Sequence, residues 1–518
     1  MTQTAVPALI EQMMQPGFYP HPVKEPIRLI QTHISYVFLT GDYAYKVKKP
    51  VNFGFLDFST LEARHHFCLE EIRMNQEIAP EIYLDVLPVS QNGDRFVLNG
   101  TEQPVEYVLK MHEFPQNDLF ICMFEQGRLT DTQMEELGRI VAQFHAKAQT
   151  SDYIRTFGEV SKIRQAFDEN YQQTEKYIDG PQTRKQFEET QQFTDAFFAN
   201  EQELFKSRIQ NNWIRECHGD LHLRNICLWQ GKIQLFDRIE FNEPFRFVDV
   251  MYDVAFAVMD LEARQRKDLG NTFLNTYVEQ TGDWEGLQVL PLYLSRQAYV
   301  RAKVTSFLLD DPAIGHDDKE EALATAARYY KLAWKYTGLQ KGQLILMSGL
   351  SGSGKTTVAR HLARRLGAVH IRSDAVRKHL AGIPLEQAGG AELYTSEMSQ
   401  RTYDRLLELG INLAKRGFPV ILDAKYDRQV FRTEAIIRAE KQQLPIRIIH
   451  CTAPEAVLRD RLLSRTNDVS DATADLLTQQ QATAERFTYT EQPLVTSVDT
   501  TQDWVAQLES THVVKSSS

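Results

Sequence analysis

A glycine-rich loop in the second half of the chain limits the folds that this sequence can adopt. The loop, Gly349–Thr356 (GLSGSGKT), follows an apolar run and precedes a segment with helical periodicity. The spacing Gly-x-x-x-x-Gly-Lys-Thr requires this strand–loop–helix context, because the backbone N–H groups of the loop must surround a phosphate at the positive end of a helix. The sequence therefore predicts a nucleotide-binding site on a sheet of parallel strands.

Each part of this loop has an expected role in binding ATP, with GTP as the alternative. Backbone amides of residues 351–355 should cradle the β-phosphate, and Lys355 should reach the β- and γ-phosphate oxygens. Thr356 should offer its hydroxyl to Mg²⁺. The residues expected to hold the nucleotide are Gly349, Ser351, Gly352, Ser353, Gly354, Lys355, Thr356 and Thr357.

From Gln343 onward, short apolar runs alternate with longer segments of helical periodicity, which is typical of a doubly wound parallel sheet. We expect the second strand to lie beside the strand that enters the phosphate loop. The residues that follow it would then face the ligand crevice at the carboxyl edge of the sheet. The expected strands are residues 343–348, 369–372, 419–422, 446–451 and 495–499.

Two charged residues follow the second of these strands. We expect Asp374 to act as the base for an acceptor hydroxyl, and Arg377, one helical turn further on, to hold a phosphate or acid of the acceptor. Ser373 or Asp374 could instead cap the helix that starts here. The Ser-Asp-x-x-Arg arrangement resembles that of small P-loop kinases, namely polynucleotide 5′-kinases, zeta-type toxins and gluconate-type kinases.

This resemblance implies roles for three more residues. The run Val420–Ala424 resembles a later strand of those kinases, in which Asp423 would be a Walker-B-like metal residue. Arg461 and Arg465 resemble a lid that clamps the transferring phosphate. A solvated helix face is the alternative for both arginines, since Asp460 can pair with them locally.

A second motif, His218–Asn225 (HGDLHLRN), lies about 130 residues before the phosphate loop and is followed by Phe236-Asp237. Four residues separate Asp220 from Asn225, which is the spacing of the protein-kinase catalytic loop. One loop can then aim Asp220 at an acceptor hydroxyl and Asn225 at a metal ion. Asp237 follows a short predicted hairpin, where a second metal ligand is needed.

This loop resembles that of the aminoglycoside phosphotransferase family, which has a bilobal protein-kinase-like fold. The resemblance covers residues 25–335 and implies that Asp220 is the base and that Asn225 and Asp237 hold Mg²⁺. It also implies a lysine on the α- and β-phosphates of ATP. That lysine is expected to be Lys46, with Lys48 on the same strand face as the alternative.

Two further positions complete the expected ATP site. Glu71 is the expected partner of the lysine, and we prefer it to Glu70 because it leaves Met74 and Ile78 on the apolar helix face. The hinge between the lobes, where adenine would meet backbone, is expected near Met111–Phe114.

The chain also departs from the family pattern. A glycine-rich phosphate loop is missing, because residues 33–42 contain only Gly41. The acidic antibiotic-binding tail of resistance enzymes is not recognisable either, so aminoglycosides are not the expected acceptors. A degenerate kinase fold that binds nucleotide without chemistry is the alternative to catalysis here.

Length, charge and cysteine content narrow the class of protein. The chain has 518 residues and a net charge of −11, which predicts two or three domains and argues against coating of nucleic acid, without excluding a local basic groove. Five scattered cysteines without a Cys-x-x-Cys pair favour a reduced, cytoplasmic protein. No uncharged run approaches the roughly 18 residues that a membrane span needs, so no membrane partner is expected.

The fold class that we expect is therefore two domains in tandem, one α+β and bilobal, the other α/β. The oligomeric state is not readable from the sequence. The expected ranges are 1–24 for an N-terminal extension, 25–113 and 114–336 for the two kinase-like lobes, 337–341 for a linker, 342–512 for the P-loop domain and 513–518 for a tail.

Three hypotheses for function follow. The first is a bifunctional ATP-dependent kinase whose two domains phosphorylate small polar metabolites. The second treats the P-loop domain as a nucleic-acid 5′-hydroxyl kinase, because its helices carry a basic cluster formed by Arg360, Arg364, Arg365, Arg372, Arg377 and Lys378. The third makes one domain a nucleotide-sensing regulator of the other, or makes another protein the acceptor.

Overall fold

The structure is a computed structural model that describes residues 5–312, 314–338, 342–464, 469 and 476–510. The chain divides into two compact units, each made of several segments. The first unit contains residues 1–129, 147–165 and 202–257, and the second contains residues 130–146, 166–201 and 258–518. Within the described residues, every helix is too short or too polar to span a lipid bilayer.

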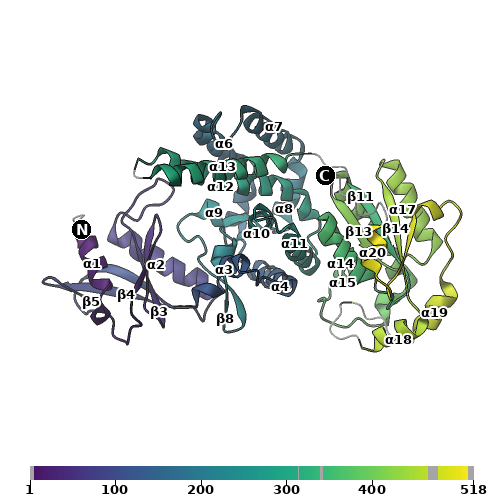
Figure 1. Cartoon of the computed structure of the whole chain (residues 1–518), viewed down its shortest axis with the longest axis horizontal. Coiled ribbons are helices and arrows are strands. Elements are labelled where there is room, and N and C mark those ends of the chain that lie inside the picture. The colour runs from purple at the N-terminus through teal and green to yellow at the C-terminus, as the bar shows by residue number, and fades with distance from the viewer. Residues whose placement is uncertain (1–4, 313, 339–341, 465–468, 470–475, 511–518) are drawn as a thin grey trace. The chain divides into compact units, whose positions relative to one another are not determined.

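The first unit begins with an antiparallel sheet of six strands in the order β1-β2-β3-β6-β4-β5 (Figure 1). Strands β2 and β3 form a hairpin that turns at Gly41-Asp42. Strand β1 was not predicted as a separate strand. The strands are β1 (Arg28–Gln31), β2 (Ser35–Leu39), β3 (Tyr43–Lys48), β4 (Tyr83–Asn92), β5 (Arg95–Leu98) and β6 (Pro104–His112).

The alternation of residues along β3 assigns its side chains to the two faces of this sheet. Tyr45 and Val47 join a buried apolar cluster that includes Leu9 of helix α1 (Ala5–Met13). Lys46 and Lys48 point to the opposite face, since successive side chains of a strand alternate. That face carries helix α2 (Leu61–Gln76), which contacts β4 and β6. The two lysines therefore lie on the side of α2, where Glu71 is buried.

The remaining elements of the first unit surround the predicted catalytic loop. Two short antiparallel pairs flank the loop, and the second pair is the hairpin predicted before Asp237. These elements are α3 (Phe120–Glu125), α5 (Asp152–Arg155), α8 (Gln202–Gln210), β7 (Ile214–Glu216) with β10 (Phe247–Asp249), β8 (Ile226–Trp229) with β9 (Lys232–Leu235), and α9 (Glu243–Arg246).

The second unit contains long helices and a parallel sheet. Helices α6 and α10 have residues in both units. The helices before the sheet are α4 (Asp131–Lys147), α6 (Val160–Thr174), α7 (Arg184–Asn200), α10 (Val250–Ala263), α11 (Lys267–Thr281), α12 (Leu290–Asp310) and α13 (His316–Lys335).

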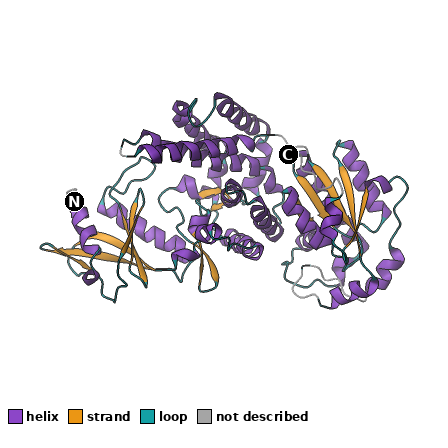
Figure 2. Ribbon diagram, in the orientation of Figure 1, coloured by secondary structure: helices purple, strands orange, loops and turns teal. Residues whose placement is uncertain are grey.

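All five predicted strands of the parallel sheet are confirmed, within one residue at each end, and Figure 2 shows helices on both of its faces. The strand order is β12-β13-β11-β14-β15, so the expectation that the second strand neighbours the P-loop strand is wrong. Strand β13 takes that place, and β12 forms the edge. The strands are β11 (Gln343–Ser348), β12 (Val369–Arg372), β13 (Pro419–Asp423), β14 (Ile446–Thr452) and β15 (Val495–Asp499).

Alternating residues of the central strand β11 pack against helices on opposite faces. Ile345 and Met347 belong to a buried cluster with residues of α14 and α20. On the other face, Gly410 of α16 lies so close to Leu344 and Leu422 that a Cβ atom there would approach both. The helices of this region are α14 (Lys355–Leu366), α15 (Ser373–Ala381), α16 (Ser396–Lys415), α17 (Gln429–Lys441), α18 (Glu455–Leu463), α19 (Leu476–Thr483) and α20 (Trp504–Glu509).

Side chains of α11 hydrogen-bond to the backbone along edge strand β12. Asn271 and Asn275 both donate to the carbonyl oxygen of Ala368, at 2.9 and 3.0 Å. The N–H of His370 donates to Asn275 Oδ1 at 2.7 Å. These amide side chains satisfy backbone groups that an edge strand otherwise leaves open.

Candidate functional site

Lys46 lies at the centre of a charged cluster in the first unit. Its Nζ is 2.7 Å from Glu71 Oε1 and 2.7 Å from Asp237 Oδ1. Burial alone would lower the pKa of Lys46, but the carboxylates of Asp237 and Glu71 hold that pKa well above its usual value. The structure thus brings together three residues that the sequence assigned to one ATP site.

Lys48, the alternative nucleotide lysine, is placed differently. Its side chain is 2% exposed, against 12% for Lys46. Its Nζ donates to Glu71 Oε2 at 2.6 Å and to Glu240. Because both of these carboxylates are buried, Lys48 has no open side toward a nucleotide. The geometry favours Lys46 as the lysine that reaches phosphate.

The catalytic loop places Asn225 directly beside Asp220. The Asn225 amide donates to the Asp220 backbone oxygen at 3.0 Å and to Asp220 Oδ2 at 3.1 Å. His222 Nε2 is 3.3 Å from the same Oδ2. Asp220 is partly exposed, so its carboxylate is accessible to an acceptor while its neighbours hold it in place.

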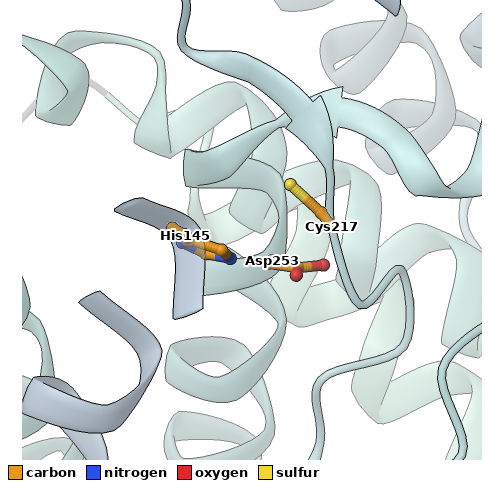
Figure 3. Close-up of side chains that lie close together, drawn as sticks. All are labelled: His145, Cys217 and Asp253. Atoms are coloured by element: carbon orange, nitrogen blue, oxygen red, sulfur yellow. The ribbon is translucent and has the colours of Figure 1, made fainter. Parts of the chain in front are cut away.

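Asp253 holds the backbone of this loop through hydrogen bonds. Its carboxylate accepts the backbone N–H groups of His218 at 2.6 Å and Gly219 at 2.8 Å. Figure 3 shows its side chain and that of Cys217, just before the loop. Burial and the charge of Asp253 raise the pKa of the Cys217 thiol well above its usual value, so this cysteine is a poor nucleophile.

Asp237 combines a functional side chain with an unusual backbone. Its φ is 62°, in the left-handed region that non-glycine residues seldom adopt, although Asp tolerates it better than most. The Asp237 N–H donates to the Tyr83 hydroxyl at 3.0 Å, and the next residue, Arg238, donates its N–H to Asn75 Oδ1 at 3.0 Å. Such backbone strain persists only where the surroundings hold it, often at functional sites.

Met111, expected at the hinge, lies near the end of β6. It is partly buried and pairs with Ala44 of β3 in the sheet register. Its strand is therefore the direct neighbour of the strand that carries Lys46.

In the second unit, the phosphate loop has the backbone that its glycines allow. Gly349 and Gly352 have φ values of 134° and 80°. A Cβ atom would lie 2.3 Å from the Cys451 carbonyl oxygen at Gly349 and 2.7 Å from that of Leu458 at Gly352. Both positions therefore need glycine for backbone conformation and for space.

The polar groups of this loop have partners within the chain. Lys355 Nζ donates to the Leu350 carbonyl at 2.8 Å, and burial lowers its pKa. The Ser351 N–H donates to Gln480 Oε1 at 3.1 Å, and the Gln480 amide donates to Ser351 Oγ at 3.1 Å. The Ser353 hydroxyl is buried and, within the part of the chain that the structure describes, has no hydrogen-bond partner. Thr356 is partly buried and Thr357 exposed.

Asp423 ends strand β13 beside the phosphate loop. Its Oδ2 is 3.0 Å from His370 Nε2, and both side chains are buried. Burial would raise the pKa of Asp423, but the hydrogen bond and charge of His370, with Arg372 and Lys355, lower that pKa to about 2. Asp423 is thus an ionised carboxylate, as a metal ligand must be.

Asp374 and Arg377 lie together on helix α15, with Arg377 Nη1 2.9 Å from Asp374 Oδ1. The helix begins at Ser373, its N-cap residue is Arg372, and no side chain caps it. The alternative role of Ser373 or Asp374 as a capping side chain is therefore not seen. The Nε of Arg377 is buried and has no hydrogen-bond partner among the described residues.

Arg461 is bound to the phosphate-loop region. Its guanidinium donates to the Gly352 carbonyl at 3.3 Å, to Thr500 Oγ1 at 2.8 Å and to the Thr500 carbonyl at 3.1 Å. The solvated alternative does not describe this side chain. Arg465, its expected partner in a lid, lies outside the described residues.

Most members of the basic cluster proposed for nucleic acid pair with the chain itself. Arg372 pairs with Glu279 at 3.1 Å, Arg365 with Glu509 at 3.3 Å, and Arg364 with Asp131. Lys378 is buried, with its Nζ on the Leu385 carbonyl at 2.9 Å. These pairings reduce the positive charge that the side chains would offer to a nucleic-acid backbone.

Three residues at these sites were not anticipated. Glu240 was recognisable in principle, because it is an acid three residues after a predicted metal ligand. Tyr83 and Gln480 carry no local signal, since only the folded chain brings them to Asp237 and Ser351.

The chain is similar to known proteins along most of its length. Residues 344–487 match the family described as "AAA domain". Over 462 residues the chain is 31% identical to the uncharacterized protein Rv2004c of Mycobacterium tuberculosis (strain ATCC 25618 / H37Rv). That alignment covers 88% of this chain and 90% of the relative. The chain belongs to the family of this mycobacterial protein.

Two solved structures resemble parts of this chain. A choline/ethanolamine kinase family protein from Mesorhizobium loti is 8% identical, with a TM-score of 0.37, and the match covers 64% of this chain and 99% of that one. A gluconokinase from Sinorhizobium meliloti 1021 is 22% identical, with a TM-score of 0.25, over 33% of this chain and 90% of that one. The AAA-domain match covers the phosphate loop and implies ATP binding in this part of the chain.

Proposed function

We propose that this protein is a bifunctional phosphotransferase, in which each half transfers the γ-phosphoryl group of ATP to a hydroxyl of a small polar metabolite. The observation that carries this proposal is the convergence of Lys46 on both Glu71 and Asp237, with Asp220 and Asn225 on the adjoining loop of the same unit. Phosphoryl transfer needs this set: a lysine on the nucleotide, metal ligands and a carboxylate that orients the acceptor.

In the first half, Asp220 would accept the proton of the acceptor hydroxyl. The acceptor oxygen forms a bond to the γ-phosphorus as the bond from that phosphorus to the β-phosphate oxygen breaks, and ADP leaves. Lys46 would hold the α- and β-phosphates, and Glu71 would keep Lys46 on the correct side of β3. Asp253 keeps the loop backbone of His218 and Gly219 in place throughout.

The residues beside Asp220 suit a hard cation such as Mg²⁺. Asn225 donates its amide N–H to Asp220, which leaves its carbonyl oxygen as the ligand atom, and Asp237 adds a carboxylate that is 43% exposed. Oxygen donors of this kind are those that Mg²⁺ prefers. Bound Mg²⁺ would neutralise charge that develops on the phosphates.

In the second half, the phosphate loop would hold ATP and Asp374 would accept the proton of the acceptor hydroxyl. Arg377 lies within reach of the same carboxylate, where it would bind an anionic group of the acceptor or the transferring phosphate. Thr356 and Asp423 provide oxygen donors for Mg²⁺ next to Lys355. Small metabolites are favoured over nucleic acid as acceptors, because most of the basic side chains are paired within the chain.

The proposal is tested by transfer of label from γ-labelled ATP into a desalted extract of metabolites and RNA. Asp220→Ala should remove one set of labelled products and Lys355→Ala another, each by at least about 10²-fold. Asp94→Ala and Lys441→Ala, which change exposed residues far from both motifs in sequence, are the matched controls. Two product sets that respond separately would support two kinases. ATP binding without any labelled product would contradict the proposal.

A further inference from the structure

Two lysines of one strand share a single buried glutamate. Lys46 Nζ lies 2.7 Å from Glu71 Oε1, and Lys48 Nζ lies 2.6 Å from Glu71 Oε2. Lys48 also bonds Glu240, whose side chain is 4% exposed. The ring of Phe58 lies 4.8 Å from Lys48 Nζ and closes this pocket with an apolar wall. Nucleotide binding at the proposed ATP site needs one lysine, which is Lys46. The second lysine, Lys48, is buried with two carboxylates behind that site, so it calls for a different role.

The charges in this cluster depend on Lys48. Lys46 and Lys48 face three carboxylates, those of Glu71, Glu240 and Asp237. When Lys46 turns to phosphate and Asp237 to a metal ion, Lys48 is the cation that stays with the two buried glutamates. Without it, Glu71 and Glu240 would both attract Lys46 and hold it away from the nucleotide, because a buried charge is costly unless paired.

Lys48 also connects the segment 237–240 to helix α2. Glu240 is three residues after Asp237 and accepts a hydrogen bond from Lys48. Lys48 also donates to Glu71 of α2, so it links Glu240 to that helix. At the other end of the segment, Arg238 donates its N–H to Asn75 and its guanidinium to the Met74 carbonyl, at 3.0 and 2.7 Å. The residues that follow Asp237 are thus held by contacts with α2, through Arg238, and with β3, through Glu240.

We propose that Lys48 is a positioning residue of the first kinase site, acting through Glu71 and Glu240 to fix the Asp237 segment and to leave Lys46 free for the nucleotide. Lys48 itself touches neither ATP nor metal in this role. The inference rests on the proposed function of the first half, since it assigns Lys46 and Asp237 to MgATP.

The test uses the full chain carrying Lys355→Ala, so that nucleotide binding reports the first site. In that background we compare Lys48→Met, Glu240→Gln and the double variant Lys48→Met/Glu240→Gln. Lys49→Met is the matched control, because Lys49 is the next residue and its side chain contacts the Thr32 carbonyl and the Tyr36 ring rather than the buried glutamates. Thermal midpoints are measured together with ATP affinity, with Mg²⁺ and with excess EDTA.

The double variant separates positioning from simple charge balance. It removes a buried lysine together with one of its carboxylates, so its thermal midpoint should recover most of what Lys48→Met loses. Its MgATP affinity should nevertheless stay about 10-fold or more below that of the parent, as for other partners that orient metal ligands. ATP affinity in EDTA should change much less, because the Asp237 segment acts through the metal.

Other outcomes would overturn the inference in distinguishable ways. MgATP affinity equal to the parent's in the double variant would show that Lys48 only balances Glu240, and the proposed function would stand. A parent that binds no MgATP would refute the first kinase site, and the role of Lys48 with it.

Discussion

Gly352 provides a quantitative test of the phosphate loop, because a second glycine in the same region serves as its control. Gly352 has a φ of 80° and Gly382, after helix α15, has a φ of 69°. Alanine at either position should cost about 1–2 kcal/mol for its left-handed backbone. Only at Gly352 would the new Cβ also lie 2.7 Å from a backbone oxygen, that of Leu458, whereas Gly382 has nothing within 4 Å.

The clash decides the expected difference between the two variants. A Cβ at 2.7 Å from a carbonyl oxygen is far inside van der Waals contact, so the phosphate loop or the start of α18 must move by several tenths of an ångström. Displacements of this order at a binding site cost about 10- to 100-fold. We therefore expect Gly352→Ala to weaken MgATP binding by that factor and Gly382→Ala to leave it within about twofold.

The assay measures MgATP affinity by calorimetry in a chain that carries Lys46→Ala. This substitution weakens binding at the first site, so the measured affinity is that of the P-loop site. The thermal midpoints of both variants report the loss of stability that alanine causes in the left-handed backbone conformation. If Gly352→Ala and Gly382→Ala bound MgATP equally well, the loop would not hold phosphate at the position inferred here.

Two further predictions concern buried groups. Burial, with the charge of Arg296, lowers the pKa of Lys303 from 10.5 to about 8, so the unfolded chain holds this proton between those values and the folded chain does not. Stability should then rise with pH across that window, and thermal midpoints of Lys303→Met should lack the rise. Parallel pH profiles of the two proteins would refute this. Iodoacetamide at about pH 8 should modify partly exposed Cys122 but spare buried Cys217 until the chain unfolds, as mass spectrometry can show. Equal labelling of both in the folded protein would be the contrary result.

Local sequence patterns predicted the elements well but not their arrangement. The apolar runs of the parallel sheet carry strong short-range signals, and their strands are confirmed. Strand β12 lies at the sheet edge, a place that depends on which strand crosses over to β11 rather than on its own four residues. Strand β1 is short and mostly exposed, so its alternation is weak.

The same limit applies to the candidate sites. Motif spacing identified Asp220, Asn225 and Asp237, and the structure places all three in one unit with Lys46. The sequence favoured Lys46 but kept Lys48 as the alternative, because both share one face of β3. Burial distinguishes them, and burial depends on residues as distant in sequence as Glu240.

The left-handed backbone of Asp237 bears on how relatives of this protein can diverge. A residue at this position must tolerate a φ of 62°, which favours Asp, Asn and Gly over other residues. Asn would preserve the turn and remove the negative charge that faces Lys46. A family member that keeps this fold but lacks the reaction proposed for the first half should therefore carry Asn here more often than any other replacement. This one column of an alignment could separate active lineages from those that only bind nucleotide.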